Sequence, residues 1–122
     1  MKILIAEDDS LILRMMELCL KKEGHDVICS KDGRDAVEKI KAQNPDLIIV
    51  DIMMPYISGL EIVGMVKQQI QPVPVIVLSA MGQQGVVDEA VKLGADHYIS
   101  KPFNIQQLSS HINRLTSPAI AS

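Results

Sequence analysis

The sequence has no excess of positive charge and no long apolar run. Its 12 lysines and arginines stand against 15 aspartates and glutamates, so the chain carries a formal charge of -3 and no general basic surface for nucleic acid. No apolar run approaches the roughly 18 residues that a membrane-spanning helix needs. The N-terminus turns acidic at Glu7, too early for a signal peptide. These absences predict a cytoplasmic protein that contacts neither membrane nor nucleic acid.

Cysteine and histidine are too sparse to form a recognisable disulfide or soft-metal framework. The only cysteines, Cys19 and Cys29, fall in a predicted helix and a predicted strand and form no CxxC pair, so we expect buried thiols. The three histidines, His25, His97 and His111, are scattered without ligand spacing. No metal site is expected at any of these residues.

Short apolar segments alternate five times with segments of helical periodicity. Strands are predicted over residues 2–6, 26–30, 47–50, 73–78 and 97–100, and the helices between and after them begin near residues 10, 33, 60, 84 and 105. Asp9 or Ser10 is the expected cap of the first helix, Asp32 of the second and Asn104 of the last. Units of roughly 24 residues suffice for a strand, a helix and two short loops. Right-handed crossovers then predict one α/β domain, residues 1–116, whose doubly wound parallel sheet has helices on both faces. Residues 117–122 form a tail or the start of a linker.

The third predicted strand is the centre of this arrangement. Leu47 to Val50 are four consecutive aliphatic residues without polar alternation, typical of a strand buried on both faces of a parallel sheet. Asp51 follows at the carboxyl end, where open α/β sheets place their functional sites. An isolated aspartate at such a position is usually a solvated loop residue, so the interpretation depends on its neighbours.

Acidic side chains follow two strands that lie next to each other in a doubly wound sheet. Glu7, Asp8 and Asp9 follow the first strand and Asp51 the third. Two carboxylates 4 Å apart repel by about 4 kcal/mol at an effective dielectric near 20. Such a cluster either raises one pKa or holds a cation, and hard oxygen ligands suit Mg²⁺. The alternative is that the acidic run only complements a helix dipole.

A hydroxyl and an ammonium complete the predicted site. Ser79 ends the fourth strand and Lys101 follows the fifth, where its charge can neutralise either a phosphoryl oxygen or an aspartate. Taken singly, Ser79 is a plausible turn residue and Lys101 a solvated lysine. Together with Asp51 and a divalent metal they are the parts of an aspartyl-phosphate site.

The same residues resemble the receiver domain of two-component response regulators, of the chemotaxis-regulator-like kind. The resemblance covers residues 2 to about 116 and rests on these motifs: Glu7-Asp8, Asp51 with Pro55 and Gly59, Ser79-Ala80, Tyr98, and Lys101-Pro102. It implies a flavodoxin-like sheet in the order 2-1-3-4-5. It also implies a signalling domain, rather than an enzyme acting on a separate substrate, that assists its own phosphorylation and dephosphorylation.

The resemblance further implies a role for each site residue. Asp51 would accept a phosphoryl group from a sensor histidine kinase or a histidine phosphotransfer protein. Mg²⁺, or Mn²⁺ in its place, would be held by Asp8, Asp51 and the backbone carbonyl of Met53, with Glu7 acting through water. Lys101, after a cis bond to Pro102, would contact the phosphoryl group.

The resemblance also implies a switch and a surface that transmits its state. The Ser79 hydroxyl would contact the phosphoryl group and move with Ala80, and Tyr98 would turn inward in response. The surface of the fourth helix, fifth strand and fifth helix would then engage a downstream protein or output domain. The protein would be a monomer or a phosphorylation-dependent dimer. His97 and His111 stand where the winged-helix class usually has an aspartate and its paired arginine, so that class's charge-paired dimer is not expected.

Three other functions fit the sequence less well. A phosphatase of the haloacid-dehalogenase kind needs a second acid two residues after its nucleophile, and Met53 stands there. A flavin or nucleotide site needs a glycine- or hydroxyl-rich first loop, and the acidic run would repel a phosphate. A degenerate receiver would lack a site residue, and none is missing. The output remains open between a stand-alone regulator and a receiver from a longer protein.

Overall fold

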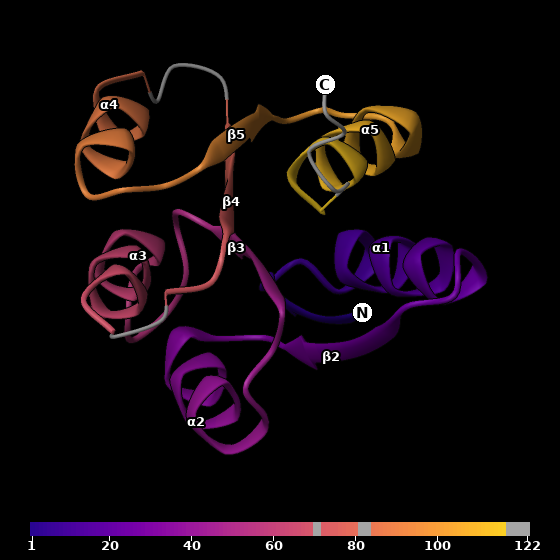
Figure 1. Ribbon diagram of the computed structural model, residues 1–122. Helices are drawn as coiled ribbons and strands as arrows, with labels where there is room; N and C mark the ends of the chain where they lie inside the picture. The colour runs from indigo at the N-terminus through magenta and orange to yellow at the C-terminus, as the bar shows by residue number, and fades with distance from the viewer. Residues whose placement is uncertain (70–71, 81–83, 117–122) are drawn as a thin grey trace, which may run out of the picture.

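The computed structural model describes residues 1–69, 72–80 and 84–116. Five strands alternate with five helices in these residues (Figure 1). The strands are β1 (Lys2–Ala6), β2 (Asp26–Ser30), β3 (Leu47–Asp51), β4 (Val75–Ser79) and β5 (His97–Ser100). The helices are α1 (Ser10–Lys22), α2 (Gly33–Gln43), α3 (Gly59–Lys67), α4 (Gln84–Lys92) and α5 (Ile105–Thr116). The five strands form one parallel sheet in the order β2-β1-β3-β4-β5, which confirms the flavodoxin-like topology.

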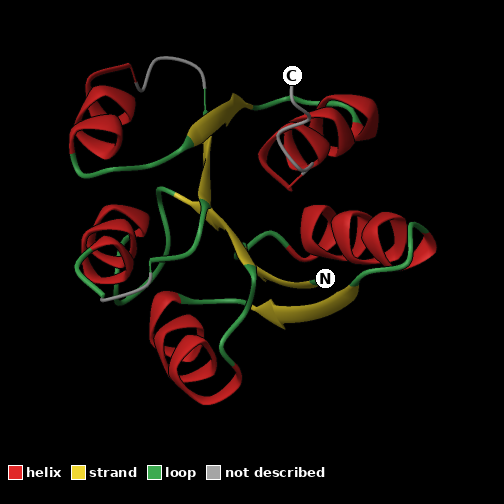
Figure 2. Ribbon diagram, viewed as in Figure 1, coloured by secondary structure: helices red, strands yellow, loops and turns green. Residues whose placement is uncertain are grey.

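The sheet is covered by helices on both faces (Figures 1 and 2). Helices α1 and α5 pack on one face, and α2, α3 and α4 pack on the other. The central strand serves both cores, because Leu47 and Ile49 face α1 and α5 while Ile48 and Val50 face the opposite layer. All four side chains have no exposed area. This two-sided burial explains why β3 is an uninterrupted aliphatic run.

Helix ends follow the chemistry expected from the sequence. The Asp9 carboxylate accepts hydrogen bonds from the amides of residues 11 and 12, and Asp32 accepts one from the amide of residue 35. Asn104 and Gln107 bond reciprocally to each other's amides, at 2.8 and 3.1 Å, in a capping box. The predicted caps are therefore confirmed, with Asp9 rather than Ser10 capping α1.

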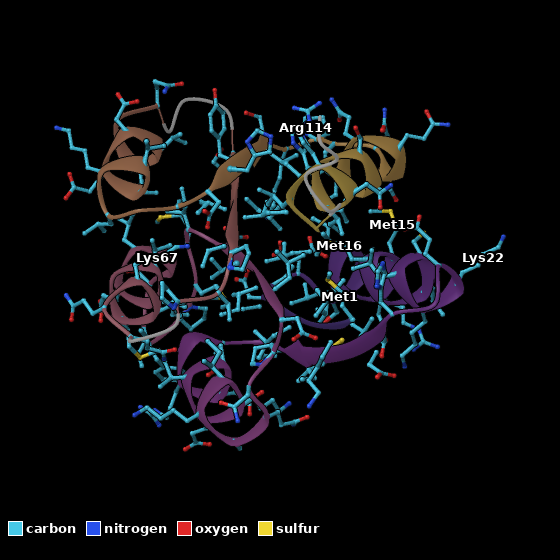
Figure 3. All side chains as sticks on the ribbon, viewed as in Figure 1. Met1, Met15, Met16, Lys22, Lys67 and Arg114 are labelled. Atoms are coloured by element: carbon cyan, nitrogen blue, oxygen red, sulfur yellow. The ribbon has the colours of Figure 1, made fainter. Side chains whose placement is uncertain are left out.

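The buried face of α1 differs from the prediction. In the sequence, Ile12, Met15, Met16 and Cys19 stand at the spacing of one helix face, whereas the buried residues are Leu13, Met16 and Leu20. Figure 3 labels Met15 and Met16; Met15 is 38% exposed and Met16 is fully buried. Eight of the 13 residues of this helix are apolar, so two adjacent stripes satisfied the same spacing. The consequence is a row of apolar side chains on the outer surface of α1.

Smaller differences concern the cysteines and the strand limits. Both thiols are free, as expected, but partly exposed rather than buried. β4 begins at Val75 instead of residue 73, and Ser79 and Asp51 are the last residues of their strands rather than the first residues beyond them. Ile70, which the sequence pattern places on the same helix face as Leu60, Val63 and Val66, lies outside the described residues, as does the tail 117–122. No helix in the described part of the chain combines the length and apolar character needed to cross a membrane.

An ion pair ties α3 to the starts of two strands. The Lys67 ammonium, labelled in Figure 3, lies 2.5 Å from an oxygen of Asp96 and 2.9 Å from the carbonyl of Val73. The same oxygen of Asp96 accepts the amide hydrogen of Val75 at 2.8 Å. Asp96 therefore holds the start of β5 against α3 and β4.

On the opposite face, two histidines connect β5 to α5. The ring centroids of His97 and His111 are 3.9 Å apart and the rings meet edge to face. Nε2 of His97 and Nδ1 of His111 are buried without a hydrogen-bond partner. The two rings therefore join β5 to α5 by ring packing rather than by a hydrogen bond through these two nitrogens.

Candidate functional site

The predicted site residues converge at the carboxyl edge of the sheet. β3 pairs with β1 on one side and β4 on the other, and β4 pairs with β5. Glu7, Asp51, Ser79 and Lys101 consequently end, or directly follow, four neighbouring strands. The first βα loop is fixed by a hydrogen bond from the Glu7 amide to the carbonyl of Ser30, at 3.0 Å.

Three carboxylates form a compact acidic cluster at this edge. One oxygen from each of Glu7, Asp8 and Asp51 lies within 4.8 Å of the others. Glu7 is fully buried and Asp51 is 5% exposed, whereas Asp8 is open to solvent. The cluster is therefore buried at Glu7 and Asp51 and reaches solvent at Asp8.

Lys101 lies inside the cluster. Its ammonium is 2.6 Å from Oδ2 of Asp51 and 2.8 Å from Oε2 of Glu7. Its amide donates to the carbonyl of Ser79 at 2.7 Å, and the Lys101-Pro102 bond is cis, as the resemblance implied. One ammonium therefore bridges two acids from different strands.

Burial and mutual repulsion give the site unusual proton affinities. The pKa of Glu7 is raised to about 7, chiefly by burial and also by the neighbouring Asp51, while hydrogen bonds from Lys101 and the Asp9 amide oppose the rise. Burial also disfavours the charged form of Lys101, but its contacts with Asp51 and Glu7 outweigh this and raise its pKa. Lys101 is therefore charged, and Glu7 exchanges its proton near neutral pH.

The donor set fits a hard divalent cation. All three clustered side chains offer carboxylate oxygens, and the buried Oε2 of Glu7 is paired with the Lys101 ammonium. A cation that takes oxygen ligands and keeps several waters, as Mg²⁺ does, matches this arrangement. One lysine cannot balance the charge of three carboxylates, so negative charge remains for such an ion to balance.

The remaining predicted residues occupy distinct places around Asp51. The Met53 amide donates to Oδ1 of Asp51 at 3.0 Å, and the Met53 side chain is 61% exposed. Ser79 is 1% exposed at the end of β4, and Ala80 follows it at the surface. Tyr98, paired with Val77 in the sheet, is 43% exposed. These observations locate the residues without testing the roles that the resemblance implied.

Sequence reasoning missed two features of the site. The direct contact of Lys101 with Glu7 was not foreseen, because only a water-mediated role for Glu7 was expected. The second is the close approach of Gly59 to the acceptor strand: a Cβ there would lie 2.7 Å from Cα of Ile52 and still nearer the Asp51 carbonyl. The glycine itself was the available signal, since a helix that begins with glycine often marks close backbone contact.

Known proteins share this fold and its sequence pattern. Residues 3–113 match the response regulator receiver domain family. The chain is 32% identical over 114 residues to the alkaline phosphatase synthesis transcriptional regulatory protein PhoP of Bacillus subtilis (strain 168). That match covers 93% of this chain and 48% of the relative, so the chain spans about half the length of this curated relative.

Solved structures agree with the sequence match. The receiver domain of the Francisella response regulator 1452 is 35% identical with a TM-score of 0.86, covering 93% of this chain and 94% of that one. The chemotaxis response regulator CheY4 of Vibrio cholerae is 31% identical with a TM-score of 0.87, covering 93% and 97%. The match to the family over nearly the whole chain, with the fold and the acidic site, shows that the chain belongs to the response regulator receiver domain family.

Proposed function

We propose that the chain is a phosphorylatable receiver that accepts a phosphoryl group on Asp51 from the histidine of a sensor kinase or phosphotransfer protein. The observation that carries this proposal is the ion pair between Lys101 and Asp51, 2.6 Å apart inside a cluster of three carboxylates. A buried carboxylate held beside one ammonium and an open acidic face is positioned to attack phosphorus. The lysine balances negative charge on the phosphoryl oxygens as the group moves from the histidine nitrogen to Asp51.

The metal completes the proposed site. Asp8, Asp51 and the Met53 carbonyl would hold Mg²⁺, with Glu7 reaching it through water, and Mn²⁺ would suit the same oxygen ligands. When bound, the ion supplies positive charge to the phosphoryl oxygens. Asp8 is exposed and Glu7 buried, which suits a direct ligand on the open side and an indirect one on the buried side.

The transfer uses this chain's side chains in a simple order. An oxygen of Asp51 bonds to phosphorus as the phosphorus–nitrogen bond to the partner histidine breaks, and the imidazole nitrogen takes a proton from solvent. Lys101 remains charged throughout because its pKa is raised. The ammonium then pairs with a phosphoryl oxygen, and the Ser79 hydroxyl donates to another.

Ser79, Ala80 and Tyr98 form the proposed switch. Ser79 is buried at the end of β4, next to β5, and Tyr98 on β5 is partly exposed. Recruitment of the Ser79 hydroxyl by the phosphoryl group would draw residue 80 toward the site and make room for Tyr98 to turn inward. The surface of α4, β5 and α5 would then change shape for a downstream protein or an output domain.

The row of apolar side chains on α1 is the surface we assign to the histidine-bearing partner. Leu11 is 83% exposed, Met15 38% and Leu18 52%. α1 begins directly after Asp8 and Asp9, so Leu11 borders the acidic edge. A partner that covers this row would bring its histidine to Asp51 and exclude water from the reaction.

The direct test is the intact mass of the protein after incubation with a small-molecule phosphodonor and Mg²⁺. We expect one added phosphoryl group in the wild type and none in Asp51→Asn, with the same dependence when a histidine kinase is the donor. Asp46→Asn, which removes an exposed acid at the other end of β3, is the matched control. Equal labelling of wild type and Asp51→Asn would overturn the assignment of the acceptor.

A further inference from the structure

The loop between β3 and α3 is held from outside by the first turn of α2. This loop contains Met53, whose amide donates to Oδ1 of Asp51. The Gly33 amide donates to the carbonyl of Pro55 at 3.2 Å. A Cβ on Gly33 would lie 2.7 Å from Cβ of Ile57 and would overlap the Ile57 carbonyl. Helix α2 therefore contacts the loop with no space for even a methyl group.

A cation–π contact joins the same two segments at the surface. The guanidinium carbon of Arg34 lies 4.5 Å from the centre of the Tyr56 ring. Tyr56 has a φ of +70°, in the left-handed region that non-glycine residues rarely occupy, although the side chain is 70% exposed. An exposed residue keeps such a conformation only when its neighbours impose it. The stacked arginine and the Gly33 contact are the neighbours in place here.

We propose that Gly33, Arg34 and Tyr56 are positioning residues that fix the acceptor loop so that the Met53 backbone faces Asp51. The inference rests on the proposed function, because its purpose is to place the Met53 carbonyl for the cation. The loop's other end is already fixed, since the Gly59 amide donates to the carbonyl of Ile52 at 2.9 Å. Figure 1 shows α2 beside α3 on one face of the sheet, so the start of α2 lies against the loop that leads into α3. The first turn of α2 contacts residues 55–57 through a hydrogen bond, a cation–π contact and close packing at Gly33.

The test separates the ring, the charge and the backbone. Tyr56→Asn removes the ring with a residue that tolerates the left-handed region, Tyr56→Phe keeps the ring, and Arg34→Gln removes the charge. Gly33→Ala adds the methyl group for which there is no room. Lys41→Gln on α2 and Gly85→Ala on α4 are matched controls, because Lys41 is exposed and a Cβ at Gly85 meets nothing within 4 Å.

The measurements are the Mg²⁺ dissociation constant by calorimetry, the amide signal of Met53 in EDTA, and the phosphorylation rate. We expect Tyr56→Asn and Arg34→Gln to weaken Mg²⁺ binding by about two- to fivefold and to shift the Met53 amide signal. Gly33→Ala should weaken binding by about tenfold. Tyr56→Phe and both controls should match the wild type. The double variant Arg34→Gln with Tyr56→Asn should lose no more than either single change, because both remove one contact.

Two failures are distinguishable. If the wild type neither binds Mg²⁺ nor takes up a phosphoryl group, the proposed function is wrong. If the wild type does both, and Tyr56→Asn and Arg34→Gln do so equally well with an unmoved Met53 signal, the positioning role is overturned. A lower melting temperature of these variants in EDTA, without weaker Mg²⁺ binding, also overturns it, because that result shows that the contact is purely structural.

Discussion

The ammonium of Lys101 lies 2.8 Å from the buried Oε2 of Glu7, an acid whose pKa is raised to about 7. The same ammonium contacts Asp51 at 2.6 Å. One positive charge thus balances two buried acids, and the structure leaves the second acid partly protonated at neutral pH. The proton on Glu7 and a cation in the cluster therefore compete for the same negative charge.

This competition predicts an inverted pH dependence of stability in the metal-free protein. The pKa of Glu7 rises from 4.5 in the unfolded chain to about 7 in the fold, so the folded state binds more protons between these values. The contribution of Glu7 to the free energy of unfolding should fall by about 3 kcal/mol as the pH rises from 4.5 to 7. Denaturant titrations in EDTA measure it. Glu7→Gln should remove this decline, and a decline that persists in Glu7→Gln would assign it to another group.

Magnesium should reverse the effect by binding the charged cluster. Saturation at 100 times the dissociation constant adds about 2.7 kcal/mol to the free energy of unfolding. We expect a higher melting temperature in millimolar Mg²⁺, with the larger increase at pH 8 than at pH 5.5, because protons no longer occupy Glu7. Asp8→Asn should lose most of this increase and Asp26→Asn, which changes an exposed acid on β2, should keep it. An equal increase in both variants would place the ion elsewhere.

Removing the shared ammonium should separate phosphorylation from signalling. Lys101→Ala should still accept a phosphoryl group from a small-molecule donor, but slowly, because Asp51 loses its charged partner. It should not transmit the change, since no ammonium connects the phosphoryl group to β5. Amide chemical shifts of residues 84–98, recorded before and after phosphorylation, measure this transmission. Wild-type shifts in the variant would show that the connection runs through other groups.

The histidine pair should limit stability on the acidic side. Burial, His97 and Arg114 lower the pKa of His111 from its usual value of 6.5. Below pH 6.5 the folded state therefore binds fewer protons at this residue than the unfolded chain does. The stability from neutral His111 is complete above pH 6.5 and is lost as the pH falls through the lowered pKa. His111→Phe keeps the ring contact and should flatten the unfolding free energy across this range. A profile identical to the wild type would exclude His111 as its source.

The lifetime of the phosphorylated form should depend on the residue two positions after the acceptor. Hydrolysis needs a water aligned behind the phosphorus, and a thioether at Met53 neither accepts a proton nor gives a strong hydrogen bond. We expect Met53→Asn to shorten the lifetime, and Met53→Asn with Met81→Glu to shorten it further, in decay assays after removal of the donor. Met81 lies outside the described residues, and Met53 is 61% exposed. Met53→Leu is the control, and equal decay in all variants would show that water access here does not set the lifetime.

The fold was predictable because each element carried its own signal. Uniform aliphatic runs marked the buried strands, and Asp9, Asp32 and Asn104 marked helix starts with a capping chemistry that the structure reproduces. The orientation of α1 was not predictable, because its two apolar stripes are equivalent until α5 covers one of them. Leu20 is fully buried and Leu18 is half exposed, and only the packing of the folded chain decides between them.

The site was predictable in composition but not in contacts. Placement at the ends of four parallel strands brought Glu7, Asp51 and Lys101 together, since neighbouring strands end at one edge. Which of these side chains contact one another depends on their conformations and burial, which the sequence does not give. The pairing of Lys101 with Glu7 was therefore missed. The contact between Arg34 and Tyr56 had no sequence signal, because two exposed residues far apart in the chain show no periodicity.

Strand β5 is anchored electrostatically at both of its ends. Asp96, just before it, is paired with Lys67 of α3, and Lys101, just after it, is paired with Asp51 and Glu7. Only the second ion pair involves Asp51, so a change of charge at Asp51 would act directly on the Lys101 end of β5 and not on the Asp96 end. If Asp51 is phosphorylated as we propose, we expect β5 to move at its Lys101 end and to stay in place at Asp96, with Tyr98 between the two ends.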